Sequence, residues 1–207
     1  MRRNKGEGTM YVIGITGGSG SGKSTVSGAL QAIGYIILDA DKIAREIVQP
    51  GKPALQEIEK TFGKNVINAD GTMNRKAVAK IVFSDEKELD KLNKITHKYI
   101  TESIKASIQN AKSHVVIDAP LLYESGLDTL CEAVVGVTAS FDVRLERIMA
   151  RDSLTEEEAK MRLNAQGSIE ANLSRVQLLL DTSENTPPAQ LAKKIDDFVK
   201  GAIHEVF

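Results

Sequence analysis

The chain has 207 residues, with 27 basic and 28 acidic side chains. This balance provides no broad basic surface for nucleic acid, and the lack of Trp with only 4% aromatic residues removes the stacking platform of a single-strand binder. The length allows one sizeable core, so we expect a single α/β domain with an inserted subdomain. The sole cysteine, Cys131, has apolar neighbours, which indicates a buried thiol in a reducing compartment such as the cytoplasm.

Residues 1–9 contain three basic side chains ahead of a short apolar run that ends in glycines. That run is too short for a signal peptide, so we expect residues 1–9 to be a disordered N-terminal extension. No stretch has the length and apolar character of a membrane span, and neither a membrane nor a nucleic acid is an expected partner.

Residues Gly17–Ser24 fit the pattern G-x-x-x-x-G-K-[ST] and follow the apolar run Met10–Ile15. This context predicts a phosphate-binding loop between a strand and a helix rather than a flexible glycine turn. Lys23 is expected to bind the β- and γ-phosphates of a triphosphate, and the Ser24 hydroxyl to bind Mg²⁺. The expected nucleotide contacts are Gly18, Ser19, Gly20, Ser21, Gly22, Lys23, Ser24 and Thr25.

Short apolar runs predict buried strands of a sheet that is flanked by helices on both faces. The expected strands are 10–15, 35–38, 114–118, 133–137 and 176–180. Successive short helices interrupt the strand–helix rhythm and predict a helical insertion at 44–112 and a lid at 141–167. The core is then made of 10–43, 113–140 and 168–207.

Local capping patterns mark several helix ends. Asn74 is expected to cap one helix, and capping boxes are expected at Asp85 with Glu88 and at Thr155 with Glu158. The helix that follows Thr155 is expected to stop at Gly167.

Three carboxylates follow predicted strands, at the edge where open α/β sheets bind ligands. We expect Asp118 to hold Mg²⁺ through water, the alternative being a cap on the next turn. Asp39 and Asp41 are expected to alternate across a strand end, and we favour Asp41 as the base that accepts the proton of the attacking hydroxyl. The alternative for this pair is to cap a helix that begins at Lys42.

Arg144, Arg147 and Arg151 recur at helical spacing and are expected to share one helix face. Such a face can neutralise charge on a transferring phosphoryl group, although an exposed charged face is the alternative. Arg162 and Gln166 share a face of the next helix and are weaker candidates for the same ligand.

The 3 histidines lack metal-ligand spacing, so no histidine metal cluster is expected. His97 lies in the long helix of the insertion. It is expected either to line an acceptor pocket or to be an ordinary, partly exposed helix residue.

Several motifs occur in a fixed order along the chain. They are Ile13–Thr25, Asp39–Glu46, Phe62–Gly63, Asp118–Glu124 and Arg151–Asp152 with Gln166. In this combination the sequence resembles the dephospho-CoA kinase family. The Asp-Ala-Asp-x-x-Ala-Arg and Pro-Leu-Leu-x-Glu stretches are far more specific to it than the phosphate-binding loop.

The resemblance implies ATP-dependent phosphorylation of the ribose 3′-hydroxyl of dephospho-CoA, the last step of coenzyme A biosynthesis. It also implies an α/β P-loop kinase fold of three layers, with a five-stranded parallel sheet, a helical acceptor-binding part and a lid. In that family pattern Asp41 is the base, Lys23 binds phosphate, and Arg147 or Arg151 acts from the lid. The implied acceptor-side residues are Asp39, Asp41, Arg45, His97, Leu121, Leu122 and Glu124.

The chain departs from the family in two places. His97 is followed by Lys98 where the family usually has Pro, and Leu179–Ser183 replaces the usual residues near the fifth strand, so adenine contacts are not transferred. A GTPase switch is disfavoured because Asn93–Thr96 lies in a helix and lacks the base-reading motif. Another P-loop nucleotide or small-molecule kinase remains the alternative, and a monomer or weak homo-oligomer is expected.

Overall fold

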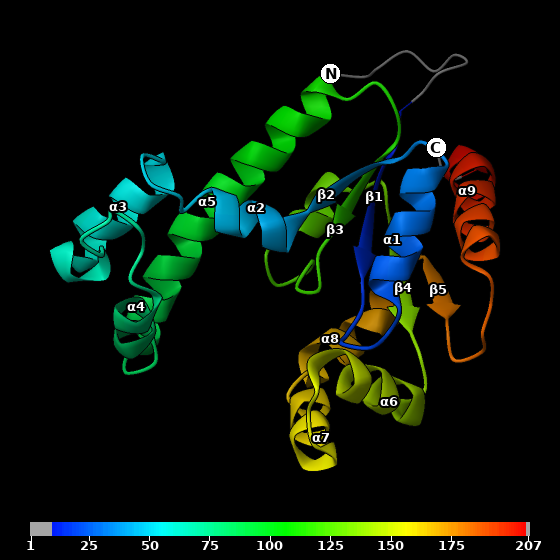
Figure 1. Ribbon diagram of the computed structural model, residues 1–207. Coiled ribbons are helices and arrows are strands. Elements are labelled where there is room, and N and C mark those ends of the chain that lie inside the picture. The colour runs from blue at the N-terminus through cyan, green and yellow to red at the C-terminus, as the bar shows by residue number, and fades with distance from the viewer. Residues whose placement is uncertain (1–9, 206–207) are drawn as a thin grey trace. The chain divides into compact units, whose positions relative to one another are not determined.

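The structure is a computed structural model that describes residues 10–205 (Figure 1). The expected N-terminal extension, residues 1–9, lies outside the described residues. The chain divides into two compact units, of which the first ends at Leu38 and resumes at Ala111, and the second is Asp39–Asn110. Within residues 10–205, no helix combines the length and apolar character needed to cross a membrane.

A five-stranded sheet in the order β2-β3-β1-β4-β5 organises the first unit. The strands are β1 (Val12–Thr16), β2 (Ile36–Asp39), β3 (Val115–Asp118), β4 (Ala133–Thr138) and β5 (Leu178–Asp181). β1 runs parallel to both β3 and β4, and β4 runs parallel to β5. All five predicted strands are present. β5 begins two residues late because Val176 follows the turn η3 (Leu173–Arg175) and packs beside Gly136.

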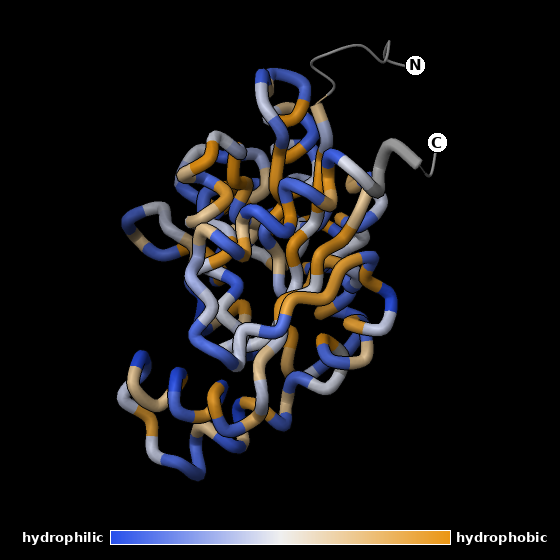
Figure 2. Tube along the Cα trace, turned by 90° about the vertical axis from the view of Figure 1, so that its right-hand side faces the viewer, coloured by the Kyte–Doolittle hydropathy of each residue, from blue (hydrophilic) through white to orange (hydrophobic). Residues whose placement is uncertain are grey.

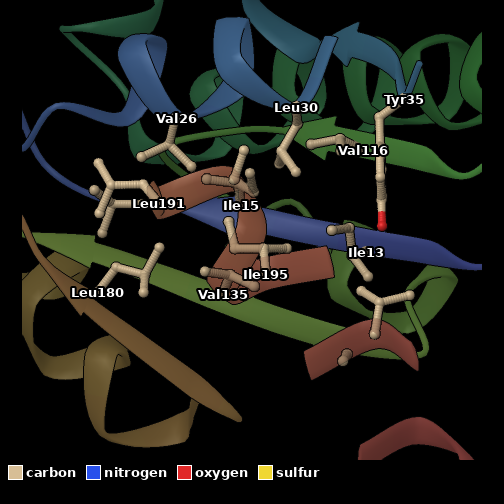
Figure 3. Close-up of a cluster of buried hydrophobic side chains, with 14 of the residues drawn as sticks. Ile13, Ile15, Val26, Leu30, Tyr35, Val116, Val135, Leu180, Leu191 and Ile195 are labelled. Carbon is tan, nitrogen blue, oxygen red and sulfur yellow. The ribbon is translucent and has the colours of Figure 1, made fainter. Parts of the chain in front are cut away.

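One face of the sheet is covered by α1 (Lys23–Ala32) and α9 (Pro188–Glu205), which lie side by side (Figure 1). Figure 2 shows the apolar stretches behind this packing, in orange, separated by hydrophilic turns in blue. Strand residues meet helix residues in one buried cluster (Figure 3), whose members include Ile13, Ile15, Val26, Leu30, Val116, Val135, Leu191 and Ile195. Since this cluster anchors α1, the loop between β1 and α1 is fixed at both ends.

The other face of the sheet is packed at close range because two strand positions are glycine. A Cβ atom at Gly14 would lie 2.6 Å from Leu122 Cδ2, and one at Gly136 would lie 2.9 Å from Leu173 Cδ2. Cys131 lies beside Gly14, and burial raises the pKa of its thiol to about 12. The half-buried thiol is therefore protonated and unreactive at neutral pH.

The segment expected to form a lid contains α6 (Phe141–Asp152), α7 (Glu156–Asn164) and the start of α8 (Gly167–Asn172). The predicted capping box is confirmed, since Thr155 accepts from the Glu158 N–H and the Glu158 carboxylate accepts from the Thr155 N–H. The expected stop at Gly167 is wrong. α7 ends at Asn164, and Gly167 begins α8, which carries Ile169 into the core at 5% exposure.

The second unit is helical. Its elements are α2 (Ala40–Glu46), α3 (Pro53–Phe62), η1 (Lys64–Val66), α4 (Arg75–Val82) and α5 (Glu86–Asn110). Asn74 caps α4 as predicted, through the Ala77 N–H. The capping box at Asp85 is wrong, because Asp85 accepts from the Lys87 N–H while the Glu88 carboxylate pairs with Lys91.

The helix α5 runs without a break through His97 and Lys98, where the family usually has proline. The Glu57 carboxylate on α3 accepts hydrogen bonds from Tyr99 Oη at 2.7 Å and Lys98 Nζ at 2.9 Å. These bonds lower the pKa of Glu57 below its usual value. Lys98 therefore ties α5 to α3 at the position where proline would remove a helix hydrogen bond.

Candidate active site

The loop from Gly17 to Gly22 connects β1 to α1 and turns through two left-handed glycines, Gly20 at φ 76° and Gly22 at φ 85°. Ser21 between them donates its N–H to the Gly18 carbonyl at 3.2 Å. Alternation with left-handed residues forms a concave nest of backbone N–H groups, which binds anions. Within residues 10–205 the Ser21 hydroxyl is buried without a hydrogen-bond partner.

The carboxylate of Asp118 meets two side chains from one face of α1. Lys23 Nζ forms an ion pair with one of its oxygens, and Ser27 Oγ donates to the other at 2.6 Å. Asp118 is 7% exposed and stands beside Ile15 in the β1–β3 register. Lys23 and Ser27 are four residues apart, the spacing that places helix side chains together, although the sequence alone did not single out Ser27. Lys23 and Asp118, which the sequence assigned separately to phosphate and to Mg²⁺, therefore lie together at one edge of the sheet.

Ser24 and Thr25 occupy the first turn of α1, and both are exposed. Hydroxyl and carboxylate oxygens are the ligands that Mg²⁺ prefers, and an ammonium group binds phosphate. The residues at this helix start, together with Asp118 and the glycine loop, therefore fit a magnesium-bound nucleoside triphosphate.

The three arginines of α6 do not form one open face. Arg144 is 6% exposed, donates from Nε to the Ser19 carbonyl at 3.0 Å and forms an ion pair with Glu170. Arg147 donates to the Gly20 carbonyl at 3.1 Å. Arg151 remains 56% exposed at its side chain. The expectation of three guanidiniums directed at one ligand is therefore wrong for Arg144, which packs against the loop instead.

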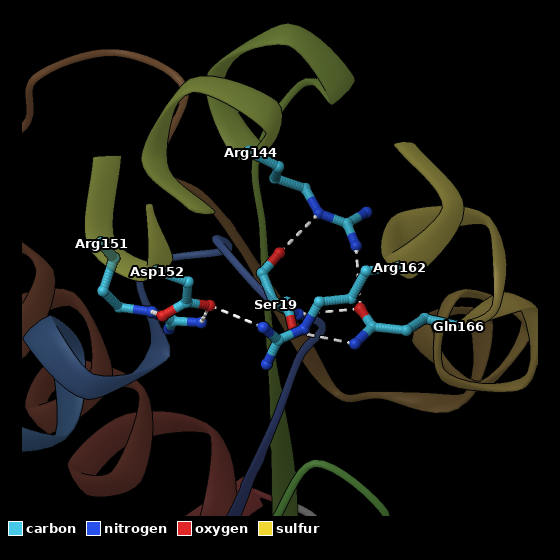
Figure 4. A network of polar contacts seen from close by, with 6 residues as sticks. All are labelled: Ser19, Arg144, Arg151, Asp152, Arg162 and Gln166. Carbon is cyan, nitrogen blue, oxygen red and sulfur yellow. Dashed lines mark hydrogen bonds and ion pairs between the residues drawn. The ribbon is translucent and has the colours of Figure 1, made fainter. Parts of the chain in front are cut away.

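Gln166 and Arg162 bind different groups (Figure 4). Gln166 accepts from the Ser19 N–H at 2.9 Å and donates to Ser19 Oγ at 2.8 Å. Arg162 instead binds Asp152, which also binds Arg151. Hydrogen bonds from Arg151, with a smaller contribution from Arg162, lower the pKa of Asp152. The shared helix face expected for Gln166 and Arg162 does not bring them to the same group.

Asp39 and Asp41 are not alternating strand residues, because α2 begins at Ala40. Asp39 ends β2 and accepts from the Lys42 N–H at 2.9 Å, so it caps α2. Asp41 lies in the first turn of α2 and is exposed. The alternative role of the pair, helix capping, therefore applies to Asp39, and Asp41 retains an exposed carboxylate.

The remaining acceptor-side residues differ in exposure. Leu121 is 52% exposed, whereas Leu122 is fully buried against Gly14 and serves packing. Glu124 accepts from Asn172 Nδ2 at 3.1 Å. Arg45 is exposed and His97 is half-buried, and both belong with Asp41 to the second unit.

Thr182, directly after β5, is a site residue that sequence reasoning missed. It is 4% exposed, and its Oγ1 donates to the Ser21 carbonyl at 2.7 Å. It also accepts from Arg147 at 2.9 Å. No local pattern marks this residue, because its partners lie far away along the sequence.

Comparison with known proteins identifies the family. A family model described as dephospho-CoA kinase matches residues 11–187. The dephospho-CoA kinase of Moorella thermoacetica is 46% identical and covers 84% of this chain and 84% of its own length. The enzyme of Shouchella clausii is 42% identical, over 84% of this chain and 92% of its own length. The solved structure of dephospho-CoA kinase from Campylobacter jejuni superposes with a TM-score of 0.67 at 27% identity, covering 94% of this chain and 100% of that one. With its parallel sheet, its phosphate-binding loop and these relatives, the chain belongs to the dephospho-CoA kinase family, the enzymes of the last step of coenzyme A biosynthesis.

Proposed function

We propose that the enzyme transfers the γ-phosphoryl group of ATP to the ribose 3′-hydroxyl of dephospho-CoA at the glycine loop. The observation that carries this proposal is the meeting of Lys23, Asp118 and Ser27 beside that loop. Lys23 at the start of α1 and Asp118 at the end of β3 supply a cation and a carboxylate of the kinds that phosphoryl transfer uses at the phosphates and at Mg²⁺.

Lys23 exchanges its ion pair with Asp118 for the β- and γ-phosphates when the nucleotide binds. Asp118 would then hold Mg²⁺ through water, and the exposed Ser24 hydroxyl would bind it directly. Mg²⁺, when bound, supplies charge neutralisation at the phosphates. Ser27 keeps Asp118 oriented through its 2.6 Å hydrogen bond.

On the acceptor side, we assign Asp41 as the base that accepts the proton of the 3′-hydroxyl. Its carboxylate is exposed in the first turn of α2, where a proton acceptor is open to a substrate. Asp39 supports it by capping α2. The proposed binding residues for the rest of the acceptor are Arg45, His97, Leu121, Leu122 and Glu124, with Leu122 acting through packing.

We assign to Arg151 the role of neutralising charge on the transferring phosphoryl group, because its side chain is 56% exposed. Arg147, the other candidate, acts through the loop that it contacts. Because a guanidinium binds an anion in a planar fork, lysine at position 151 would replace it only in part.

An ADP-release assay with dephospho-CoA, nucleoside monophosphates and small alcohols as acceptors tests the proposal. Dephospho-CoA should be preferred, and product mapping should find the new phosphate on the ribose 3′-oxygen. Faster turnover with a nucleoside monophosphate or a small alcohol would identify another P-loop kinase instead. Phosphate on the pantetheine end would show that the acceptor orientation is wrong.

We further propose a cytoplasmic enzyme that acts as a monomer or weak homo-oligomer, without nucleic acid or membrane as a partner. The nearly balanced charge and the single half-buried thiol support this proposal. Sedimentation at several protein concentrations tests the oligomeric state, and cell fractionation tests the location.

A further inference from the structure

Three consecutive carbonyl groups of the glycine loop are bound from outside the loop. Arg144 Nε donates to the Ser19 carbonyl at 3.0 Å, and Arg147 Nη1 donates to the Gly20 carbonyl at 3.1 Å. Thr182 Oγ1 donates to the Ser21 carbonyl at 2.7 Å. We call Arg144, Arg147 and Thr182 the outer brace.

We propose that the outer brace orients the backbone N–H groups of the loop for phosphate before the nucleotide arrives. In a trans peptide, the carbonyl of one residue and the N–H of the next point in opposite directions. With the Ser19 and Ser21 carbonyls tied outward, the N–H groups of Gly20 and Gly22 are directed toward the concave side of the loop. The Ser21 N–H is not available to phosphate, because it donates to the Gly18 carbonyl within the loop.

The brace is itself held rigidly. Arg144 and Thr182 are 6% and 4% exposed. Arg144 also contacts Gln166 (Figure 4) and forms an ion pair with Glu170. Arg147 donates from Nη2 to the Thr182 carbonyl at 2.7 Å, so the α6 and β5 sides of the brace are joined. A buried and cross-linked donor holds its geometry without a ligand, as preorganisation requires.

The glycine pattern of the loop fits the same role. A Cβ atom at Gly20 would lie 2.7 Å from the Arg144 carbonyl oxygen, and one at Gly22 would lie 2.9 Å from Thr182 Oγ1. These glycines therefore admit the brace in addition to providing left-handed turns. Since the brace contacts the loop's outer carbonyls, its members are positioning residues and act on the nucleotide through the backbone.

Thr182→Val tests the inference, because it keeps the side-chain shape but removes the donor to Ser21. Calorimetry with ADP and with inorganic triphosphate should show about tenfold weaker binding of both, the effect of losing one buried hydrogen bond. In turnover assays KM for ATP should rise by a similar factor, while kcat at saturating ATP should change much less. Thr182→Ser, which keeps the hydroxyl, should restore both affinities. Thr186→Val makes the same substitution in the segment between β5 and α9 and is the matched control. Its ADP and triphosphate affinities should equal those of the wild type.

Arg144→Gln provides a second test from the other side of the loop and should also weaken ADP and triphosphate together. Unchanged ADP and triphosphate affinities in Thr182→Val, with only a lower melting temperature, would reduce the brace to a stabilising contact. A fall in kcat at constant KM would instead show that Thr182 stabilises the transition state and not bound nucleotide. The inference rests on nucleotide binding at this loop, so a wild-type enzyme that bound neither probe would overturn the proposed function itself. Wild-type binding with an unaffected Thr182→Val variant would overturn only the brace.

Discussion

At the scale of single residues, Lys23 has two functions that can be separated. It is proposed to bind phosphate, and it neutralises Asp118, whose side chain is only 10% exposed. Lys23→Met should lower turnover by about 10²- to 10³-fold, since a preorganised cation at the transferring group is lost. It should also lower the free energy of unfolding by about 2 kcal/mol, because a largely buried carboxylate loses its partner.

Urea unfolding and steady-state kinetics check both effects of Lys23→Met. The double variant Lys23→Met with Asp118→Asn should recover part of the stability but none of the activity, because the uncompensated charge is removed along with the magnesium ligand. If the stability losses of Lys23→Met and Asp118→Asn add up to the loss of the double variant, Lys23 and Asp118 do not interact in solution.

A second prediction at this scale concerns His114, which follows α5, stacks on the Tyr11 ring and lies tilted against the Tyr35 ring. Burial lowers the pKa of His114, although Asp196 opposes and Lys200 supports the shift. Its Nδ1 accepts from the Tyr11 N–H at 3.1 Å, a bond that protonation at Nδ1 would break. Because the folded pKa lies below the unfolded one, stability is lost as pH falls through the ordinary histidine pKa of about 6.5.

The melting temperature of the wild type should therefore be lower near pH 5.5 than near pH 7.5. Asp196 adds to this fall only at more acidic pH. Burial raises its pKa, but hydrogen bonds from Lys200 and Tyr35 outweigh that effect and lower it. His114→Gln should flatten the curve between the two pH values. An unchanged slope in His114→Gln would assign the pH dependence to other groups.

At the scale of elements, the fit of β1 against the segment that follows β3 depends on Gly14. Gly14→Ala should lower the free energy of unfolding by about 1–3 kcal/mol, because the added methyl meets Leu122 Cδ2 and Cys131 Sγ in a packed interior. Combining it with Leu122→Ala should cost less than the sum of the two single changes.

Gly28→Ala in α1 is the matched control for that experiment. Nothing lies within 4 Å of a Cβ atom at Gly28, so alanine should raise helix stability by about 0.5–1 kcal/mol. Thermal or urea unfolding measures all four variants, including Leu122→Ala alone. A neutral Gly14→Ala would show that the segment moves away from β1 without cost.

At the scale of the whole molecule, the proposed reaction assigns the phosphate groups to Lys23 and the proton of the acceptor hydroxyl to Asp41. Asp41→Asn should lower turnover by about 10²- to 10⁴-fold, because the proton acceptor is lost while the side-chain shape remains. Dephospho-CoA should still bind the variant within a few-fold of wild type, as measured by calorimetry.

Asp39→Asn is the control for Asp41→Asn, and it should have a small effect because asparagine caps helices as well as aspartate does. Loss of dephospho-CoA binding in Asp41→Asn would make this residue an acceptor anchor. Normal turnover would remove it from the mechanism altogether.

The sequence by itself determined the parts of this protein that depend on neighbouring residues. Apolar runs located the five strands, Asn74 and Thr155 marked helix starts, and the glycine pattern before Lys23 predicted the phosphate-binding loop. Each of these features is coded within a few residues, so a local pattern is enough to reveal it. The family followed from the order of several such motifs.

Only the tertiary structure decided how distant side chains meet at the loop. Arg144 and Ser19 are separated by 125 positions, and Thr182 and Ser21 by 161. The helical spacing of the α6 arginines was correct, but that spacing gives a shared face and says nothing about whether the face is buried. Parallel strands with crossover connections bring the ends of β1, β4 and β5 to one edge, and contacts across that edge exist only once the sheet has formed.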